Sequence, residues 1–355
     1  SQIERSAAAA EAGAALLVVI NDGAGTLYDI AAGTVPVIAV SAEEGEHLLA
    51  DPAATRITGK AIALPAYEYD YAHTWQGSVP ADLTLKPGKG DVVAVTDRFA
   101  DPTPRTVQVT RYDCPSYLTR CLGSTRLWES GTDHVTYLSP GQEGIAAPWV
   151  ADVSVPSVGL DLRDVKRSHA AGSEIVLDWF GVQAPRQGDG FWRSEHRKER
   201  IRVNMPLAST TDGITATWGR AATVSSKLYQ GDTLLASSSS QSVTGTATGA
   251  GHQQYRLETS VTVPQETWST SNRTTSTWAF GMDAAETGIL PLIGLTYDVP
   301  VDGDRAVSAN GWTKLSVIAA HEPGALRAGE VTELSLELSY DEGKTWQAVE
   351  VTHDG

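Results

Sequence analysis

From about residue 61 onward, the sequence consists of short runs in which apolar and polar residues alternate, separated by Gly, Pro, Asp and Ser. Clear examples are 91–95 (DVVAV), 106–110 (TVQVT) and 254–263 (QYRLETSVTV). In a strand, successive side chains point to opposite faces of the sheet, so a period of two gives one apolar and one polar face. Such runs at regular spacing, with turn signals between them, are typical of antiparallel sandwiches. The pattern therefore predicts a mainly β protein.

The first 60 residues have a different pattern. An Ala-rich stretch over 4–15 favours a helix, and the continuous apolar run 16–20 (LLVVI) is typical of a buried parallel strand. A second apolar strand is expected over 35–40 (VPVIAV), and Ser41 with Glu44 fits a capping box that opens another helix. The order helix, strand, turn, strand, helix predicts a small α/β unit.

These changes of pattern predict four regions. A partial α/β unit over 1–60 is followed by a β-rich intermediate region over 61–165 and by a β-sandwich over 166–287. Residues 288–355 have the pattern of an immunoglobulin-like or fibronectin-like domain. About four strands are expected there, whereas such a sandwich normally has about seven, which predicts a truncated last domain.

Charge and hydropathy exclude several classes of partner. The formal net charge is −16, which argues against nucleic acid because phosphate binding needs a basic face. No apolar run approaches the roughly 20 residues of a membrane-spanning helix, so no membrane partner is expected. No leader pattern is present at Ser1. If the protein is exported, its signal lies upstream of this chain.

Sequence signatures of catalysis are absent. The chain has no Gly-x-Ser-x-Gly, no His-Glu-x-x-His, no P-loop and no Gly-x-Gly-x-x-Gly. Its eight histidines are scattered singly, which is typical of surface or structural histidines. No catalytic residue is therefore predicted, although a triad assembled from distant residues stays open because triads are defined by geometry.

The two cysteines, Cys114 and Cys121, lie seven positions apart, as read from the sequence. A zinc site would need further ligands, and no Cys-x2-Cys or His-x3-His spacing accompanies them. In an exported protein, a local disulfide that closes a small loop is the expected use of such a pair.

Two acidic clusters leave alternatives open. Asp298, Asp302 and Asp304 could supply oxygen ligands to a structural Ca²⁺, or they could be turn residues between strands. No other cofactor is expected. Glu68 and Asp70, with His73 and the surrounding aromatic side chains, could line a carbohydrate or peptide groove or pack between domains. The aromatic residues in this stretch are Tyr67, Tyr69, Tyr71 and Trp75.

One short motif is specific. Residues 339–346 (SYDEGKTW) match the Asp-box pattern, in which an Asp bonds turn amides, a Gly takes a conformation that other residues resist, and a Trp packs under the hairpin. Its key positions here are Ser339, Asp341, Gly343 and Trp346. Asp boxes recur in sialidases and other propellers, but a propeller repeats them at blade spacing. A single copy predicts that the motif only stabilises its own hairpin.

A stretch of low complexity extends from Ser237 to Gly251 and consists mainly of Ser, Thr, Gly and Ala. This composition is typical of flexible connections and predicts a mobile hairpin loop.

The N-terminal segment resembles the protease-associated domain. The resemblance is carried by residues 7–23 (AAAAEAGAALLVVINDG), 35–41 (VPVIAVS) and the pair Glu44-Gly45. The family pattern is a helix ending Ala-Gly-Ala, a strand ending Asn-Asp, a strand of Ile-Pro-Val type and a helix that begins near Gly. The strand that precedes the first helix in the family is missing here. This departure predicts that the chain begins inside a domain.

Segments further along resemble the C-terminal region of long actinobacterial subtilisin-like serine proteases: 71–82 (YAHTWQGSVPAD), 179–186 (WFGVQAPR), 226–231 (SKLYQG), 290–293 (LPLI) and the Asp-box hairpin. The family's catalytic contexts, Asp-(Ser/Thr)-Gly, His-Gly-Thr-His and Gly-Thr-Ser-Met-Ala, do not occur here. The resemblance implies a non-catalytic accessory region of a secreted, extracellular endopeptidase. It implies as partners a catalytic subtilisin-like domain, in the same polypeptide or as a companion chain, and a protein or peptide substrate.

Two other readings remain. A stand-alone secreted β-sandwich could serve as a binding or adhesion module for glycan or protein, which the Trp and Tyr content would suit. A glycosidase-associated domain is the other reading, suggested by the single Asp box. A glycosidase needs two carboxyl groups about 5–10 Å apart in a cleft.

Overall fold

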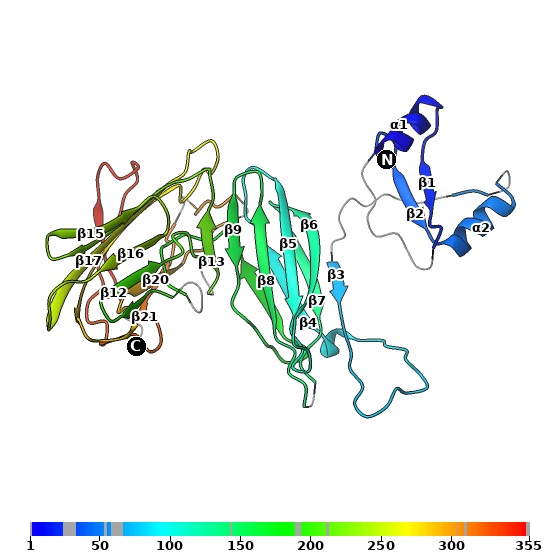
Figure 1. Cartoon of the computed structure of the whole chain (residues 1–355). Coiled ribbons are helices and arrows are strands. Elements are labelled where there is room, and N and C mark those ends of the chain that lie inside the picture. Colours follow the sequence, from blue (N-terminus) through cyan, green and yellow to red (C-terminus); the bar gives the residue numbers. More distant parts are fainter. Residues whose placement is uncertain are drawn as a thin grey trace. The chain divides into compact units, whose positions relative to one another are not determined.

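The computed structural model describes residues 2–23, 33–52, 55–57, 67–142, 144–188, 193–210, 213–302, 304–308 and 311–352. The protein is mainly β, with 42 % strand and 6 % helix in several antiparallel sheets, which confirms the predicted fold class. The chain divides into two compact units, one within 1–63 and one within 64–355. Figure 1 shows the helices in the first unit and the large sheets in the second.

The N-terminal unit has the predicted order of elements. Helix α1 (Gln2–Glu11) is followed by strands β1 (Leu17–Ile20) and β2 (Val37–Val40) and by helix α2 (Ala42–Ala50). The two strands pair in parallel, with Leu17 opposite Val37. All four residues of each strand are only half-buried, so the expectation of fully buried strands was wrong. The described part of the unit supplies too few elements to cover both faces of a two-stranded sheet.

The capping box at the start of α2 is present. The Ser41 hydroxyl accepts a hydrogen bond from the Glu44 amide at 3.2 Å, and the Glu44 carboxylate accepts one from the Ser41 amide at 2.9 Å. Within the helix, Gly45 packs against β1, because a Cβ at this position would lie 2.2 Å from the side chain of Ile20. The missing side chain therefore allows α2 to lie directly on the strand.

Two sheets form the first sandwich of the large unit. The four-stranded sheet has the order β10 (Glu174–Asp178), β4 (Val93–Arg98), β7 (Asp133–Leu138) and β3 (Tyr67–Asp70). A short 3-10 helix, η1 (Lys89–Asp91), precedes β4. The five-stranded sheet has the order β13 (Thr215–Trp218), β9 (Leu160–Arg163), β8 (Trp149–Val155), β5 (Thr106–Asp113) and β6 (Leu122–Glu129). The five-stranded sheet is antiparallel throughout, whereas β10–β4 and β3–β7 are parallel pairs.

Two further four-stranded sheets are antiparallel. One has the order β16 (Ser242–Thr246), β12 (Arg200–Asn204), β11 (Glu195–Arg197) and β19 (Gly288–Ile289). The other has the order β15 (Thr233–Ser238), β14 (Thr223–Gln230), β17 (His252–Thr262) and β18 (Arg273–Asp283). Two short hairpins follow: β20 (Ile293–Asp298) with β21 (Ser316–His321), and β22 (Leu336–Leu338) with β23 (Gln347–Val349).

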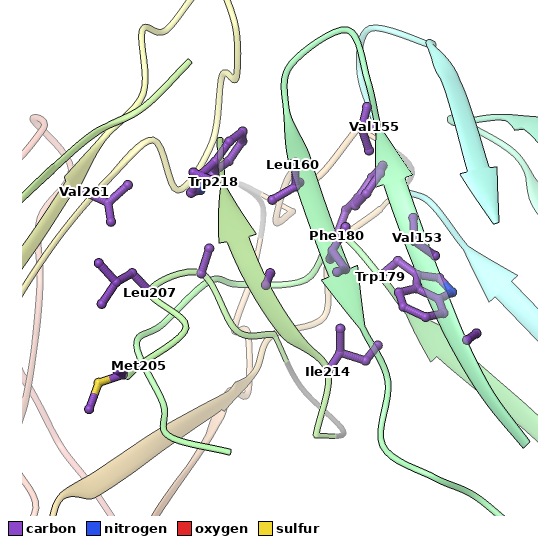
Figure 2. Close-up of a cluster of buried hydrophobic side chains, with 14 of the residues drawn as sticks. Val153, Val155, Leu160, Trp179, Phe180, Met205, Leu207, Ile214, Trp218 and Val261 are labelled. Carbon is purple, nitrogen blue, oxygen red and sulfur yellow. The ribbon is translucent and has the colours of Figure 1, made fainter. Parts of the chain in front are cut away.

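One hydrophobic core runs through both pairs of large sheets. Figure 2 shows Leu160 and Trp218 between Val153 of the first sandwich and Val261 of the second. Among the described residues, every buried hydrophobic side chain lies between Val92 and Leu292. The two terminal hairpins therefore lie outside the core that stabilises this unit.

The sheets cross the predicted region boundaries. Strand β10 pairs with β4, and β13 pairs with β9, so strands on both sides of the predicted division at 165/166 belong to one sandwich. In the same way, β19 pairs with β11 across the predicted division at 287/288. Composition changes along a chain cannot reveal such pairings, because sheet neighbours are chosen in space rather than in sequence order.

The prediction of a mobile loop over Ser237–Gly251 was wrong for about half of its length. Its first residues complete β15, and 242–246 form β16. Within β16 the side chain of Val243 is buried, and a Cβ at Gly245 would lie 3.0 Å from the side chain of Leu228. Alternation of hydroxyl residues with one valine and one close-packed glycine is enough to form a half-buried strand.

Candidate functional site

A cleft in the large unit has a volume of about 1140 Å³. It lies between the outer face of the five-stranded sheet and one face of the β20–β21 hairpin. Both walls belong to the large unit. This volume is slightly above the usual range of small-ligand sites, about 300–1,000 Å³, so the cleft has room for an extended ligand.

The sheet wall consists of two rows of polar side chains that run across four strands. Residues such as Val109, Val153 and Leu162 point into the core, so their neighbours along each strand point outward into the cleft. Strand register then aligns these outward residues. The first row is Gln108, Ser154, Asp161 and Thr217; the second row is Thr110, Asp152, Arg163 and Thr215.

The hairpin wall is made of small and apolar residues. Gly294 and Ala320 are opposite each other in the β20–β21 register, as are Thr296 and Ile318, and all four line the cleft. Arg186 joins the two walls, because its guanidinium donates to the Thr296 hydroxyl at 2.7 Å and to a backbone carbonyl beside the sheet at 3.1 Å. A Cβ at Gly294 would lie 2.8 Å from Arg186 Cγ, so the glycine makes room for this connection.

Burial tunes the charges on the sheet wall. It raises the pKa of Asp152, an effect that the Arg163 guanidinium at 3.5 Å opposes and the Asp161 carboxylate reinforces. Burial also raises the pKa of Asp164, whose carboxylate is held by Arg167 at 2.7 Å. The wall thus offers carboxylate, hydroxyl and amide groups as hydrogen-bonding partners, with Arg163 as their counter-charge.

The cleft contains both a serine and a histidine. Ser154 and His321 line it, but no hydrogen bond joins them in the described part of the chain. A nucleophilic serine needs a base within hydrogen-bond reach. In this structure Ser154 and His321 are therefore not arranged as a nucleophile and its base.

The first sandwich contains a buried ion pair. The Asp97 carboxylate accepts hydrogen bonds from Arg111 and from the indole N–H of Trp179, both at 2.8 Å. Burial raises the pKa of Asp97 against the opposing effect of the Arg111 guanidinium. The Arg111 guanidinium also stacks over the ring of Trp149, 5.0 Å from its centroid. This group holds the two sheets together across the core.

A second buried carboxylate joins distant parts of the chain. Asp101 accepts hydrogen bonds from Arg305 at 3.0 Å and from Ser130 at 2.9 Å, and it pairs with Arg105 at 2.8 Å. The Arg305 guanidinium lies over the ring of Trp268, 4.0 Å from its centroid. The contact fixes the turn around 302–306 to the first sandwich.

The predicted cluster around Glu68 and Asp70 lies at the open edge of that sandwich. Glu68 pairs with Arg126 of β6 at 3.1 Å, and Asp70 accepts a hydrogen bond from Ser124 of β6 at 3.0 Å. Burial, reinforced by the neighbouring Asp70 charge, raises the pKa of Asp113 to about 6. These acidic side chains therefore link the two sheets of the sandwich.

The other members of this cluster separate from the carboxylates. His73 packs edge-on against Trp75, with ring centroids 4.9 Å apart, and contacts Gln142. Tyr67 and Tyr69 are exposed, and Tyr69 stacks on Tyr137 at 4.9 Å. The structure therefore does not gather the predicted groove residues into one site.

The two cysteines are bonded to each other. Cys114 and Cys121 form a disulfide next to the cleft. Asp302 acts as a turn residue, since its carboxylate accepts hydrogen bonds from the backbone amides of Asp304 at 3.0 Å and of residue 306 at 2.9 Å. Asp298 is the last residue of β20. Within the described residues, no group of three or more His, Cys, Asp or Glu side chains is arranged to hold a metal ion.

The Asp box has the expected local bonds. Asp341 accepts hydrogen bonds from the amides of Lys344 and Thr345 at 3.0 and 2.8 Å, and from the Thr345 hydroxyl at 2.7 Å. The Ser339 hydroxyl accepts from the Gly343 amide at 2.7 Å, and Gly343 has a φ of +83°. The hydrogen bonds from Thr345 lower the pKa of Asp341 to about 2. The indole N–H of Trp346 donates to the Gly343 carbonyl at 3.2 Å.

Sequence reasoning did not identify the polar rows. The signal was present as polar residues at every second position in 106–110, 152–154, 161–163 and 215–217. Such alternation reveals which residues share a face of one strand, but it does not reveal which strands become neighbours.

None of the described helices is both long enough and apolar enough to span a bilayer. Comparison with known proteins found no protein-family model, no curated protein and no solved structure that matches this chain.

Proposed function

We propose that this chain is a non-catalytic accessory region of a secreted subtilisin-like serine endopeptidase. The observation that carries the proposal is the parallel β1–β2 pair between α1 and α2. It is formed by the same residues, 7–23 and 35–45, that resemble the protease-associated domain. In this role the N-terminal unit shapes the access of peptide substrates to a catalytic domain, which is the partner of the chain.

The β-rich unit would stabilise the extracellular enzyme. The buried pairs Asp97–Arg111 and Asp101–Arg305 and the disulfide between Cys114 and Cys121 support this role. A disulfide persists in an oxidising, extracellular environment, where it restricts the unfolded chain. The acidic net charge of −16 favours solubility.

The first test is intact-mass and N-terminal analysis of the native secreted protein, with all co-purifying chains identified. A companion chain, or one longer polypeptide, that carries a Gly-Thr-Ser-Met-Ala-type segment is the expected result. If the native protein instead begins at a signal-cleavage site just before Ser1 and purifies alone, the proposal fails.

The second test addresses catalysis. The purified chain is expected to leave a fluorogenic peptide library and casein uncleaved, and to take up no label from a serine-directed fluorophosphonate. Cleavage that this reagent abolishes would contradict the accessory role.

A further inference from the structure

The two polar rows of the cleft form a regular array. Adjacent strands in a sheet lie about 4.8 Å apart, so four outward residues in register extend over about 14 Å perpendicular to the strands. In the first row, Ser154 is opposite Gln108 on one side and Asp161 on the other, and Asp161 is opposite Thr217. Hydrogen-bonding groups thus repeat at the strand spacing along the length of the cleft.

The first row is free to bind a ligand. In the described part of the chain, the side chains of Gln108, Ser154, Asp161 and Thr217 have no hydrogen-bond or ion-pair partner. In the second row, the Asp152 Oδ1 atom is buried without a partner, although Oδ2 faces Arg163. Polar atoms in a cleft are normally satisfied by water or ligand, so a ligand rich in hydroxyl groups would complete them.

The repeat distance discriminates between linear ligands. An extended polypeptide advances about 3.3 Å per residue, whereas the polar side chains of each row are about 4.8 Å apart. Its hydrogen-bonding groups would therefore lose register with the rows after one or two residues. The rings of a linear oligosaccharide repeat at nearly the strand spacing and carry hydroxyl groups on each ring. The cleft is lined by carboxylates and by three cationic side chains, Arg163, Lys166 and Arg186. The carboxylates are in excess, which disfavours an anionic ligand. They are Asp152, Asp161, Asp164 and Glu322.

We propose that the cleft between the five-stranded sheet and the β20–β21 hairpin binds a linear, uncharged oligosaccharide across β5, β8, β9 and β13. The polar rows bind the hydroxyl groups. The small residues Gly294 and Ala320 leave room for the rings against the hairpin wall. Among the described residues, no Phe, Tyr or Trp lines the cleft, so the described walls recognise a ligand through hydrogen bonds. The site does not depend on the protease-accessory role and would remain if that role failed.

The test is native affinity electrophoresis of the full chain in gels that contain hydroxyethylcellulose, galactomannan or soluble starch. At least one of these neutral polymers is expected to retard the wild-type chain, and carboxymethylcellulose is expected to retard it less. The triple variant Ser154→Ala, Asp161→Ala, Thr217→Val should weaken the retardation constant at least tenfold. The variant Thr106→Val is the matched control. Thr106 lies on the same face of β5 as Gln108 and Thr110, but it does not line the cleft.

A second variant keeps the test decisive if the triple variant fails to fold. Ala320→Trp fills the cleft from the exposed hairpin wall and leaves both polar rows intact. It should abolish retardation while its circular dichroism and thermal midpoint stay near those of the wild type. The proposal is overturned if no neutral polymer retards the wild-type chain or if retardation survives Ala320→Trp. Retardation by gelatin that Ala320→Trp abolishes would also overturn it and assign the cleft to polypeptide.

Discussion

Asp97 and Asp113 are carboxyl groups whose pKa is raised by burial, but their surroundings differ. Asp97 faces the guanidinium of Arg111 at 2.8 Å and an indole donor, so its charge is compensated within the core. Asp113 lies beside a second carboxyl group, Asp70, whose charge raises the pKa of Asp113 by more than the Arg111 charge lowers it. The first group should therefore stabilise the native state through pairing, and the second should destabilise it when ionised.

Substitution of Asp97 tests the buried pair. Asp97→Ala leaves the Arg111 guanidinium buried without its partner and should lower the free energy of unfolding by about 3–5 kcal/mol. Equilibrium denaturation in urea measures the change. The control is Asp133→Ala, which removes the exposed pair with Arg98 and should cost less than about 1 kcal/mol. Equal losses for the two variants would contradict the role assigned to Asp97.

Substitution of Asp113 tests the carboxyl pair through pH. The folded-state pKa of about 6 exceeds the ordinary value of 3.8, so the folded state holds the proton more tightly than the unfolded state. The contribution of Asp113 to the free energy of unfolding is therefore fully present below the ordinary pKa, and it is lost as the pH rises through about 6. Asp113→Asn keeps a neutral side chain at every pH. The variant should equal the wild type near pH 4 and exceed it by about 1 kcal/mol at pH 8, after discounting for partial exposure.

Thermal unfolding at one-unit steps from pH 4 to pH 8 measures this difference. The counterpart Asp133→Asn alters an exposed carboxylate that is remote from Asp70 and should give no comparable trend with pH. If the Asp113→Asn variant is instead less stable than the wild type at pH 8, the ionised Asp113 carboxylate stabilises the native state, and the prediction is wrong.

At the scale of elements, the Asp-box hairpin is stabilised by its own turn rather than by burial. Strands β22 and β23 pair through only three residues each, from Leu336–Val349 to Leu338–Gln347. No buried hydrophobic side chain follows Leu292 in the described residues. The Asp341 carboxylate accepts four hydrogen bonds within the motif, so this one side chain supplies much of the local order.

Asp341→Ala should therefore loosen the hairpin without unfolding the protein. We expect amide exchange in β22 and β23 to accelerate about tenfold, because the hydrogen bonds that Asp341 accepts within the turn are lost. Hydrogen exchange with mass spectrometry measures this, and the global thermal midpoint should stay unchanged. Lys344→Ala keeps its backbone donor to Asp341 and serves as the control. A lowered global midpoint in Asp341→Ala would mean that the hairpin supports the core.

At the scale of the whole molecule, the two units differ in how much apolar surface they bury. The described part of the N-terminal unit contains no buried hydrophobic side chain, whereas the large unit contains a continuous core from Val92 to Leu292. Since hydrophobic burial is the main stabilising contribution to folding, the units should not be equally stable.

The units are therefore expected to unfold separately. In a urea titration followed by hydrogen exchange, peptides from α1 to α2 should lose protection at a lower concentration than peptides from β14, β17 and β18. The long strands of that sheet pair over as many as eleven residues, from His252–Asp283 to Thr262–Arg273, and provide an internal reference. A single midpoint shared by all peptides would contradict independent unfolding.

The sequence by itself determined the features that depend on nearby residues. The mainly β class, the order of the N-terminal elements, the capping box at Ser41 and Glu44 and the turn of the Asp box all followed from the printed residues. Each rests on local composition, on a period of two or on hydrogen bonds between residues three or four positions apart. Such patterns keep their meaning wherever the segment lies in the protein.

Tertiary structure alone decided which strands became neighbours. The alternation in 106–110 could place Gln108 and Thr110 on a polar face, but it could not align Gln108 with Ser154 or extend that row to Thr217. The pairing of Asp101 with Arg305 joins residues 204 positions apart. The physical reason is that periodicity fixes the face of a strand, whereas its partner is selected by packing of the whole core.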